Sequence, residues 1–166
     1  MEWPLADTQM PLQCNRNRIL LVDDEDSIRR LFRIILSSRI PDCDVDQARN
    51  GAEALEAFSQ DHHSVLLMDL HMPVMDGQVA FHEIKKLCAT RDWEMPSIVF
   101  CTGFAPPDSV MGVVREDRNH ALLLKPVSTD VLVEAVRTRL RRGAGGVTAH
   151  PGIPDEGQHH ADPAGA

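Results

Sequence analysis

The stretch Ser64–Pro73 reads Ser-Val-Leu-Leu-Met-Asp-Leu-His-Met-Pro, and the rest of the chain is organised around it. Its apolar part has the length of a buried strand and ends on a single carboxylate, Asp69. Pro73 and Gly77 then break the chain into a turn. In an open α/β sheet, ligands bind where the chain leaves the carboxyl end of a strand. Asp69 is therefore a candidate nucleophile or metal ligand, although a solvated aspartate in a turn has the same local sequence.

Apolar runs and helical segments alternate on both sides of this stretch. Four further runs predict strands over residues 19–22, 43–48, 97–101 and 121–124, each followed by apolar positions at helical spacing. The runs are continuous rather than alternating, which is typical of parallel strands covered on both faces. Because parallel crossovers are right-handed, the pattern predicts an α/β doubly wound fold, a five-stranded parallel sheet with helices on both faces.

The first predicted helix begins just after Asp24. Apolar residues from Ile28 to Leu36 recur at helical spacing, and either Asp26 or Ser27 is available as its N-cap. Three arginines occupy the opposite face, which is most simply a solvated one. These arginines are Arg29, Arg30 and Arg33.

Composition excludes several classes of protein. The chain has 166 residues and a net charge of −8, which argues against a DNA-binding surface as its main function. No apolar stretch approaches the roughly 20 residues that span a bilayer, and the amino terminus lacks the pattern of a signal peptide. The four cysteines are too widely spaced for a zinc site, and we expect them to be reduced in a cytoplasmic protein with no membrane contact. They are Cys14, Cys43, Cys88 and Cys101.

The chain is predicted to hold one domain, over residues 18–142. Residues 1–17 mix proline, amide and charged side chains without a period, and we expect them to be disordered. Residues 143–166 consist mainly of glycine, alanine, proline, histidine and acidic residues, and we expect a disordered tail there. A DNA-binding domain would need roughly 60 further residues with an apolar period, so we expect output through protein contacts or by passing a phosphoryl group onward.

Four of the five predicted strands end on a functional group, and parallel strands bring these ends to one edge of the sheet. The groups are Asp23 with Asp24, Asp69, Thr102 and Lys125. Three neighbouring carboxylates repel one another, so either their pKa values rise or a cation lies among them. Hard oxygen ligands at an open edge suit Mg²⁺, and Lys125 can meet a phosphate. A carboxylate nucleophile, a bridging cation and further donors are what phosphoryl transfer requires.

The chain resembles the receiver domains of two-component response regulators over about residues 18–142. The resemblance is carried by four motifs in a specific order and spacing: Leu21–Glu25 (LVDDE), Met68–Gly77 (MDLHMPVMDG), Cys101–Gly103 (CTG) and Leu124–Pro126 (LKP). It implies a flavodoxin-like fold with strand order 2-1-3-4-5. It also implies a signalling protein rather than an enzyme, with only self-phosphorylation and self-dephosphorylation chemistry.

The resemblance further assigns a role to each matched residue. Asp69 would accept a phosphoryl group from a phosphohistidine on a sensor histidine kinase or a histidine phosphotransfer protein. Asp24, Asp69 and the backbone carbonyl of His71 would hold Mg²⁺, with Asp23 acting on it through water. Thr102 would move toward the aspartyl phosphate and Lys125, before a cis proline, would pair with it. The face formed by the fourth helix, fifth strand and fifth helix would then contact a downstream effector protein.

Three positions depart from the family or vary within it. The family usually has tyrosine or phenylalanine three residues before the lysine, whereas this chain has Leu122 and no tyrosine at all. We therefore expect an intact phosphorylation site with a different readout. His71 and Phe104 lie two residues after Asp69 and Thr102, at positions that in the family tune the loss of phosphate. Their bulk would shield an acyl phosphate from water, or His71 is an exposed spacer.

Two other functions remain open at this point. Asp24 and Asp26 follow an apolar strand with the spacing of the nucleophile and acid of haloacid-dehalogenase-type phosphohydrolases, which depend on Mg²⁺. That alternative leaves Asp69 with Pro73 and Gly77 unexplained. A receiver-like scaffold that binds its partner without phosphorylation is the second alternative. The complete acceptor, metal and lysine positions argue against it, and Leu122 keeps it open.

Overall fold

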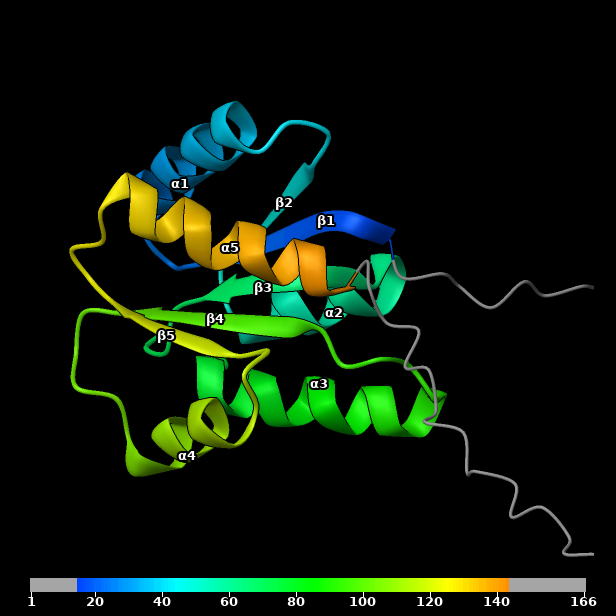
Figure 1. The fold of residues 1–166 in the computed structure, drawn as a ribbon. Helices are drawn as coiled ribbons and strands as arrows, with labels where there is room; N and C mark the ends of the chain where they lie inside the picture. Colours follow the sequence, from blue (N-terminus) through cyan, green and yellow to red (C-terminus); the bar gives the residue numbers. More distant parts are fainter. Residues whose placement is uncertain (1–14, 144–166) are drawn as a thin grey trace, which may run out of the picture.

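Five parallel strands form the middle layer of the structure, a computed structural model that describes residues 15–143 (Figure 1). Their order in the sheet is β2-β1-β3-β4-β5, which confirms the predicted doubly wound fold. The elements, in chain order, are β1 (Asn15–Val22), α1 (Asp26–Arg39), β2 (Asp44–Ala48), α2 (Gly51–Asp61), β3 (His63–Met68), α3 (Gly77–Arg91), β4 (Ser97–Thr102), α4 (Asp108–Glu116), β5 (Ala121–Leu124) and α5 (Thr129–Gly143). Among the helices of this described part, none is long and apolar enough to cross a membrane.

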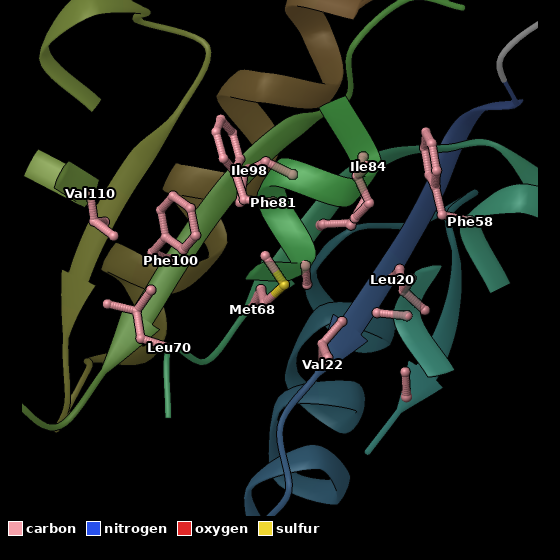
Figure 2. Close-up of a cluster of buried hydrophobic side chains, with 14 of the residues drawn as sticks. Leu20, Val22, Phe58, Met68, Leu70, Phe81, Ile84, Ile98, Phe100 and Val110 are labelled. Atoms are coloured by element: carbon pink, nitrogen blue, oxygen red, sulfur yellow. The ribbon is translucent and has the colours of Figure 1, made fainter. Parts of the chain in front are cut away.

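Helices cover both faces of the sheet. Helices α1 and α5 pack on one face of the sheet, where the strand side chains buried beneath them include Ile19, Leu21 and Val65. Helices α2, α3 and α4 pack on the other, around a cluster that includes Leu20, Met68 and Phe100 (Figure 2). Because successive side chains of a strand point to opposite faces, a strand buried on both sides is mostly apolar. All six residues of β3 are buried: the four from Val65 to Met68 are apolar, and the polar His63 and Ser64 at its start hydrogen-bond to Asp46 and to the Arg18 carbonyl.

Strand β1 begins at Asn15, three residues before the predicted domain boundary at 18. Polar residues open this strand, so the apolar pattern does not mark its start. Arg18 is held there by ion pairs to Asp46 and Asp61 with N–O distances of 2.6 and 3.2 Å. The rest of the predicted lead-in, residues 1–14, and the predicted tail from residue 144 lie outside the described residues.

Helix α1 differs from the prediction at two places. Its N-cap is Glu25, one residue before the predicted Asp26 or Ser27, and it makes no side-chain capping bond. The prediction of a solvated Arg29 is wrong, because only 5% of this residue is exposed. The reason is local: the loop before α1 and its first turn offer a carbonyl and a carboxylate to the guanidinium. Arg30 and Arg33 are exposed, as predicted.

Other helix ends follow the sequence closely. Asn50 caps α2 by accepting a hydrogen bond from the Glu53 amide at 2.9 Å, and Glu53 in turn accepts one from the Arg49 amide at 2.8 Å. Ser128 caps α5 through its hydroxyl oxygen, which accepts from the Val131 amide at 3.4 Å. These caps satisfy backbone amides where α2 and α5 begin, just after the ends of β2 and β5.

Candidate functional site

The carboxylates of Asp23, Asp24 and Asp69 meet at the carboxyl edge of the sheet. Asp23 and Asp24 follow β1 and Asp69 follows β3, so the loops that carry them lie side by side on the left in Figure 1. A hydrogen bond of 2.9 Å from the Asp69 amide to the Val22 carbonyl joins the two strand ends. One oxygen of each carboxylate lies within 4.8 Å of the others; Asp23 and Asp69 are buried and Asp24 is exposed.

Lys125 brings a positive charge into this cluster from the end of β5. Its Nζ lies 2.6 Å from Asp23 Oδ2 and 3.5 Å from Asp69 Oδ2. The peptide bond between Lys125 and Pro126 is cis, as the resemblance implied. Burial lowers the pKa of Lys125, but the hydrogen bond to Asp23 and the charges of Asp23 and Asp69 raise it above the ordinary value. The ammonium group therefore stays charged beside the carboxylates.

Asp69 lies where negative charge is unfavourable. Burial, and then the charge of Asp23, raise the pKa of Asp69 above its ordinary value, although the charge of Lys125 acts in the opposite direction. Of the three carboxylates, Asp23 and Asp69 contact the Lys125 ammonium group, and the balance of charge at this edge is negative. A divalent cation with oxygen ligands fits such a set, and the exposed side of Asp24 leaves room for water ligands. The three carboxylates could therefore hold a divalent cation.

Thr102, His71 and Phe104 form a second group beside Asp69. The Thr102 side chain is buried, and its Oγ1 lies 3.5 Å from His71 Nδ1 and accepts a hydrogen bond of 3.3 Å from the Phe104 amide. The rings of His71 and Phe104 meet edge to face, with centroids 5.0 Å apart. The amide of His71 also donates to Asp69 Oδ1 at 3.3 Å. The structure therefore brings all the predicted site residues to one edge, with an exposed aromatic pair next to Asp69.

Gly77 supports the Asp69 loop by leaving space for it. Its amide donates a hydrogen bond of 2.9 Å to the Leu70 carbonyl. A Cβ atom at this position would overlap the Asp69 carbonyl oxygen and lie 3.0 Å from the Leu70 Cα. Among the described glycines none has a positive φ, so the requirement here is for space rather than for backbone freedom.

We expect Gly77→Ala to lower the free energy of unfolding by about 3 kcal/mol, because the added methyl group forces backbone apart in a packed region. Urea unfolding monitored by circular dichroism measures this loss. Gly112→Ala is the matched control: its Cβ meets nothing within 4 Å in α4, and the change should raise stability by about 0.5–1 kcal/mol. Equal stability of Gly77→Ala and the unsubstituted chain would contradict the close approach of the Asp69 loop.

The structure contains a second polar cluster that the sequence analysis missed, at the opposite edge of the sheet. Asp46, Asp61 and His63 gather there around Arg18. His63 Nε2 lies 2.9 Å from Asp46 Oδ2, and burial lowers the pKa of this histidine. The strand beginnings meet at this edge just as the strand ends meet at the other. Arg18 supplies positive charge to this cluster through its two ion pairs, while Nδ1 of the buried His63 has no hydrogen-bond partner among the described residues.

Comparisons with known proteins agree with this geometry. The model of the response regulator receiver domain matches residues 19–137. The chain is 30% identical to the chemotaxis protein CheY of Bacillus subtilis over 124 residues, which cover 75% of this chain and 98% of CheY. It is 32% identical over 146 residues to the probable transcriptional regulator ycf27 of Porphyra purpurea, covering 88% of this chain and 56% of that protein.

The chain spans about half the length of the first curated relatives it matches, which are named probable transcriptional regulators. Its structure also resembles the crystal structure of a response regulator receiver domain protein from Clostridium thermocellum. The TM-score is 0.65 at 25% sequence identity, and the match covers 76% of this chain and 96% of that one. The fold, the strand-end residues and the family match over most of the sequence agree: this chain belongs to the family of response regulator receiver domains, signalling modules of two-component systems.

Proposed function

We propose that this chain accepts a phosphoryl group on Asp69 from the phosphohistidine of a sensor histidine kinase or a histidine phosphotransfer protein, and signals through altered contacts with other proteins. One observation carries the proposal. The Asp69 carboxylate lies between two further carboxylates and the Lys125 ammonium group, at the edge of the sheet where the loops open to solvent. This is the arrangement that an in-line transfer to a carboxylate needs.

In the proposed reaction a carboxylate oxygen of Asp69 attacks phosphorus, and an acyl phosphate bond forms. The P–N bond to the donor imidazole breaks, and its electron pair stays on the imidazole nitrogen. Lys125, with its Nζ 3.5 Å from Asp69 Oδ2, would pair with a phosphoryl oxygen. Thr102 would leave its contact with His71 and donate its hydroxyl to another oxygen of the phosphoryl group.

The acidic cluster suits a magnesium ion in this reaction. The carboxylates of Asp24 and Asp69 would hold it, with Asp23 acting through water and the backbone carbonyl of His71 as a further ligand. When bound, Mg²⁺ would neutralise charge on the transferring oxygens. The ion would also offset the repulsion among the carboxylates, since Lys125 balances only part of their charge.

The experiment that tests the proposal is incubation of the full chain with acetyl phosphate and Mg²⁺, followed by intact-mass measurement. We expect a mass gain of one phosphoryl group that requires Mg²⁺ and is prevented by a chelator. A chain that stays unmodified at high donor concentration would contradict the proposal. It would favour the alternative of a scaffold that binds its partner without phosphorylation.

The hydrolase alternative requires Asp26 to act as a free acid beside Asp24. In the structure the Asp26 carboxylate binds two guanidinium groups, with Arg29 at 2.7 Å and Arg30 at 2.6 Å. These ion pairs support the receiver proposal over the hydrolase. Turnover of a small phosphate ester that is lost in Asp24→Asn and retained in Asp69→Asn would reverse this preference.

The proposed output surface is the face formed by α4, β5 and α5. Leu124 and Val131 expose 59% and 52% of their surfaces there, and Phe104 exposes 67% in the loop between β4 and α4. Exposed apolar side chains of this size favour a protein partner over DNA. Leu122 is half-buried against the core beneath α4, so we propose that the readout proceeds through packing shifts rather than an aromatic flip.

We also propose a cytoplasmic location. Cys43, Cys88 and Cys101 are all free thiols, which is the usual state of cysteines in a reducing compartment. Cys14 lies outside the described residues.

The His71–Phe104 pair gives a prediction about the lifetime of the phosphoryl group. We expect His71→Ala and Phe104→Ala each to shorten the half-life of the acyl phosphate by roughly three- to tenfold, because an aromatic pair of this kind contributes about 1 kcal/mol and its loss admits water. Loss of the phosphoryl mass over time measures the half-life. Val74→Ala, at an 85% exposed position in the same loop as His71, is the control. Unchanged half-lives would leave His71 as an exposed spacer.

A further inference from the structure

Arg29 is a buried charge that the proposed reaction does not use. It lies in the first turns of α1, yet only 5% of the residue is exposed. Its Nη1 donates to the backbone carbonyl of Asp23 at 2.7 Å, and its Nη2 donates to Asp26 Oδ1 at 2.7 Å. Burying a guanidinium costs free energy unless such partners are present, so both bonds are part of why the side chain turns inward.

The carbonyl that Arg29 holds belongs to the most constrained residue of the site. The Asp23 amide donates to the Ala48 carbonyl at 3.2 Å, and its Oδ1 accepts from the Glu25 amide at 2.9 Å. Its Oδ2 accepts from Lys125 at 2.6 Å. Arg29 adds the remaining restraint, on the peptide group between Asp23 and Asp24. A rotation of that peptide would change the course of the backbone at Asp24 and so the position of its carboxylate relative to Asp23 and Asp69.

Arg30 provides an internal comparison. It carries the same charge on the next residue of the same helix, and its Nη2 lies 2.6 Å from Asp26 Oδ2. Its side chain is 75% exposed, whereas that of Arg29 is 6% exposed. Arg30 pairs with Asp26, and only Arg29 of the two also reaches the carbonyl of Asp23. The two arginines therefore differ in their contact with the loop and not in charge.

The charge of Arg29 and its hydrogen bond to the Asp23 carbonyl predict opposite effects on Mg²⁺ binding when Arg29 is replaced. A positive charge near the acidic cluster repels a second cation, so its removal alone would strengthen Mg²⁺ binding. Loss of the bond to the Asp23 carbonyl would instead loosen the loop and weaken Mg²⁺ binding. Groups that orient metal ligands typically change metal affinity by about 10- to 100-fold when they are removed.

We infer that Arg29 is a positioning residue for the cation site: it fixes the peptide group between Asp23 and Asp24 and so holds their carboxylates in the arrangement that binds Mg²⁺. The inference rests on the proposed function, because it assigns a role within the same acidic site. Arg29 itself touches neither the cation nor the phosphoryl group. Its contribution passes through the Asp23 carbonyl.

The test is calorimetric titration of the full chain with Mg²⁺ for Arg29→Gln, Arg29→Lys and Arg30→Gln. We expect the Kd for Mg²⁺ to rise about tenfold or more in Arg29→Gln. Arg29→Lys keeps the charge but has one donor group in place of the fork, so its Kd should lie between those of Arg29→Gln and the unsubstituted chain. Arg30→Gln should stay within about twofold, since exposed ion pairs contribute little.

Urea unfolding and phosphoryl uptake from acetyl phosphate complete the experiment. A positioning role predicts that uptake by Arg29→Gln recovers at saturating Mg²⁺, which a merely structural defect would not. A folded Arg29→Gln that binds Mg²⁺ as tightly as the unsubstituted chain, or more tightly, would overturn the inference. If Arg29→Gln does not fold, an unchanged Kd in Arg29→Lys has the same consequence. Absence of Mg²⁺ binding by the unsubstituted chain would overturn the proposed function and this inference together.

Discussion

Replacing Asp69 by asparagine is expected to abolish phosphoryl uptake while making the protein more stable. The amide has no carboxylate oxygen to attack phosphorus, so incubation with acetyl phosphate and Mg²⁺ should leave the mass of Asp69→Asn unchanged. The substitution is nearly isosteric, and the amide oxygen can still accept the hydrogen bond that the His71 amide gives to Asp69 Oδ1. Loss of uptake would then reflect the missing nucleophile rather than a disturbed fold.

The gain in stability follows from the charge of the site. Burial and the neighbouring Asp23 raise the pKa of Asp69, so the folded protein disfavours its ionised form. We expect Asp69→Asn to raise the free energy of unfolding at pH 7 by about 1 kcal/mol, as is typical for removal of an unfavourable charge. A group with a raised pKa contributes stability below its unfolded pKa and loses that contribution as the pH rises through its folded pKa. The advantage of Asp69→Asn should therefore shrink as the pH falls toward 4.

Glu56→Gln is the control for these measurements, because Glu56 is an exposed acid on α2, away from the sheet edge. It should take up the phosphoryl group normally and leave the stability unchanged within about 0.5 kcal/mol. Uptake retained in Asp69→Asn would place the acceptor elsewhere and contradict the proposed function. A loss of stability in Asp69→Asn would show instead that the Asp69 carboxylate is held favourably by Lys125.

The strand-end residues could be predicted because a parallel sheet converts sequence order into position. Asp23, Asp69 and Lys125 lie far apart along the chain, yet each follows an apolar run that ends at the same edge. Continuous apolar runs also implied helices on both faces. For these features the local sequence pattern is enough to place the residues in the fold, so they could be predicted from the sequence alone.

Arg29 was predicted wrongly, because it was grouped with Arg30 and Arg33 on the polar face of α1. It precedes the buried Phe32 by three residues and the buried Leu36 by seven, so it lies on the same side of the helix as they do. The sequence does not reveal its partner there, a carbonyl in the preceding loop whose direction is set by the hydrogen bonds of Asp23. Contacts between a side chain and the backbone of a loop depend on tertiary geometry that no period in the sequence encodes.

The start of β1 and the Arg18 cluster were missed in the sequence for a related reason. Strand beginnings in this fold carry polar residues, so the apolar signal weakens there although pairing continues. Parallel register brings Arg18 opposite Asp44 in β2, next to Asp46 on the same strand. Ion pairs between the strands then stabilise the end of the sheet where the strands begin, although no apolar pattern in the sequence indicates it.

The second large effect is expected from Lys125→Met, which keeps most of the side-chain length and removes the ammonium group. Asp23 and Asp69 would then face each other without their shared cation, and Asp23 has only 3% of its side chain exposed. Breaking one partner out of a buried ion pair typically costs about 3–5 kcal/mol, and we expect a loss of that size at pH 7 in urea unfolding. Lys86→Met, at a 76% exposed position, should change stability by less than about 0.5 kcal/mol.

The pH dependence of Lys125→Met identifies the cause of that loss. Without the ammonium group, the pKa of Asp69, already raised by burial, should rise further, and a raised pKa gives stability that is present at low pH and lost as the pH rises. Lowering the pH from 7 toward 4 should therefore recover part of the lost stability relative to the unsubstituted chain. A deficit that stays constant over this range would indicate lost packing of the lysine side chain instead.

Added Mg²⁺ should restore stability to Lys125→Met, because it supplies the positive charge that the substitution removes. The ammonium group and a divalent cation compete for the same carboxylates, so its removal should lower the Kd for Mg²⁺ by about tenfold or more, given that charges at close range interact by a few kcal/mol. Added Mg²⁺ then stabilises the variant more than the unsubstituted chain. Phosphoryl uptake should nevertheless fall, because no ammonium group remains to pair with the phosphoryl oxygens. Tighter metal binding with slower uptake separates the two roles of Lys125, and an unchanged Kd would mean that it does not occupy the cation's place.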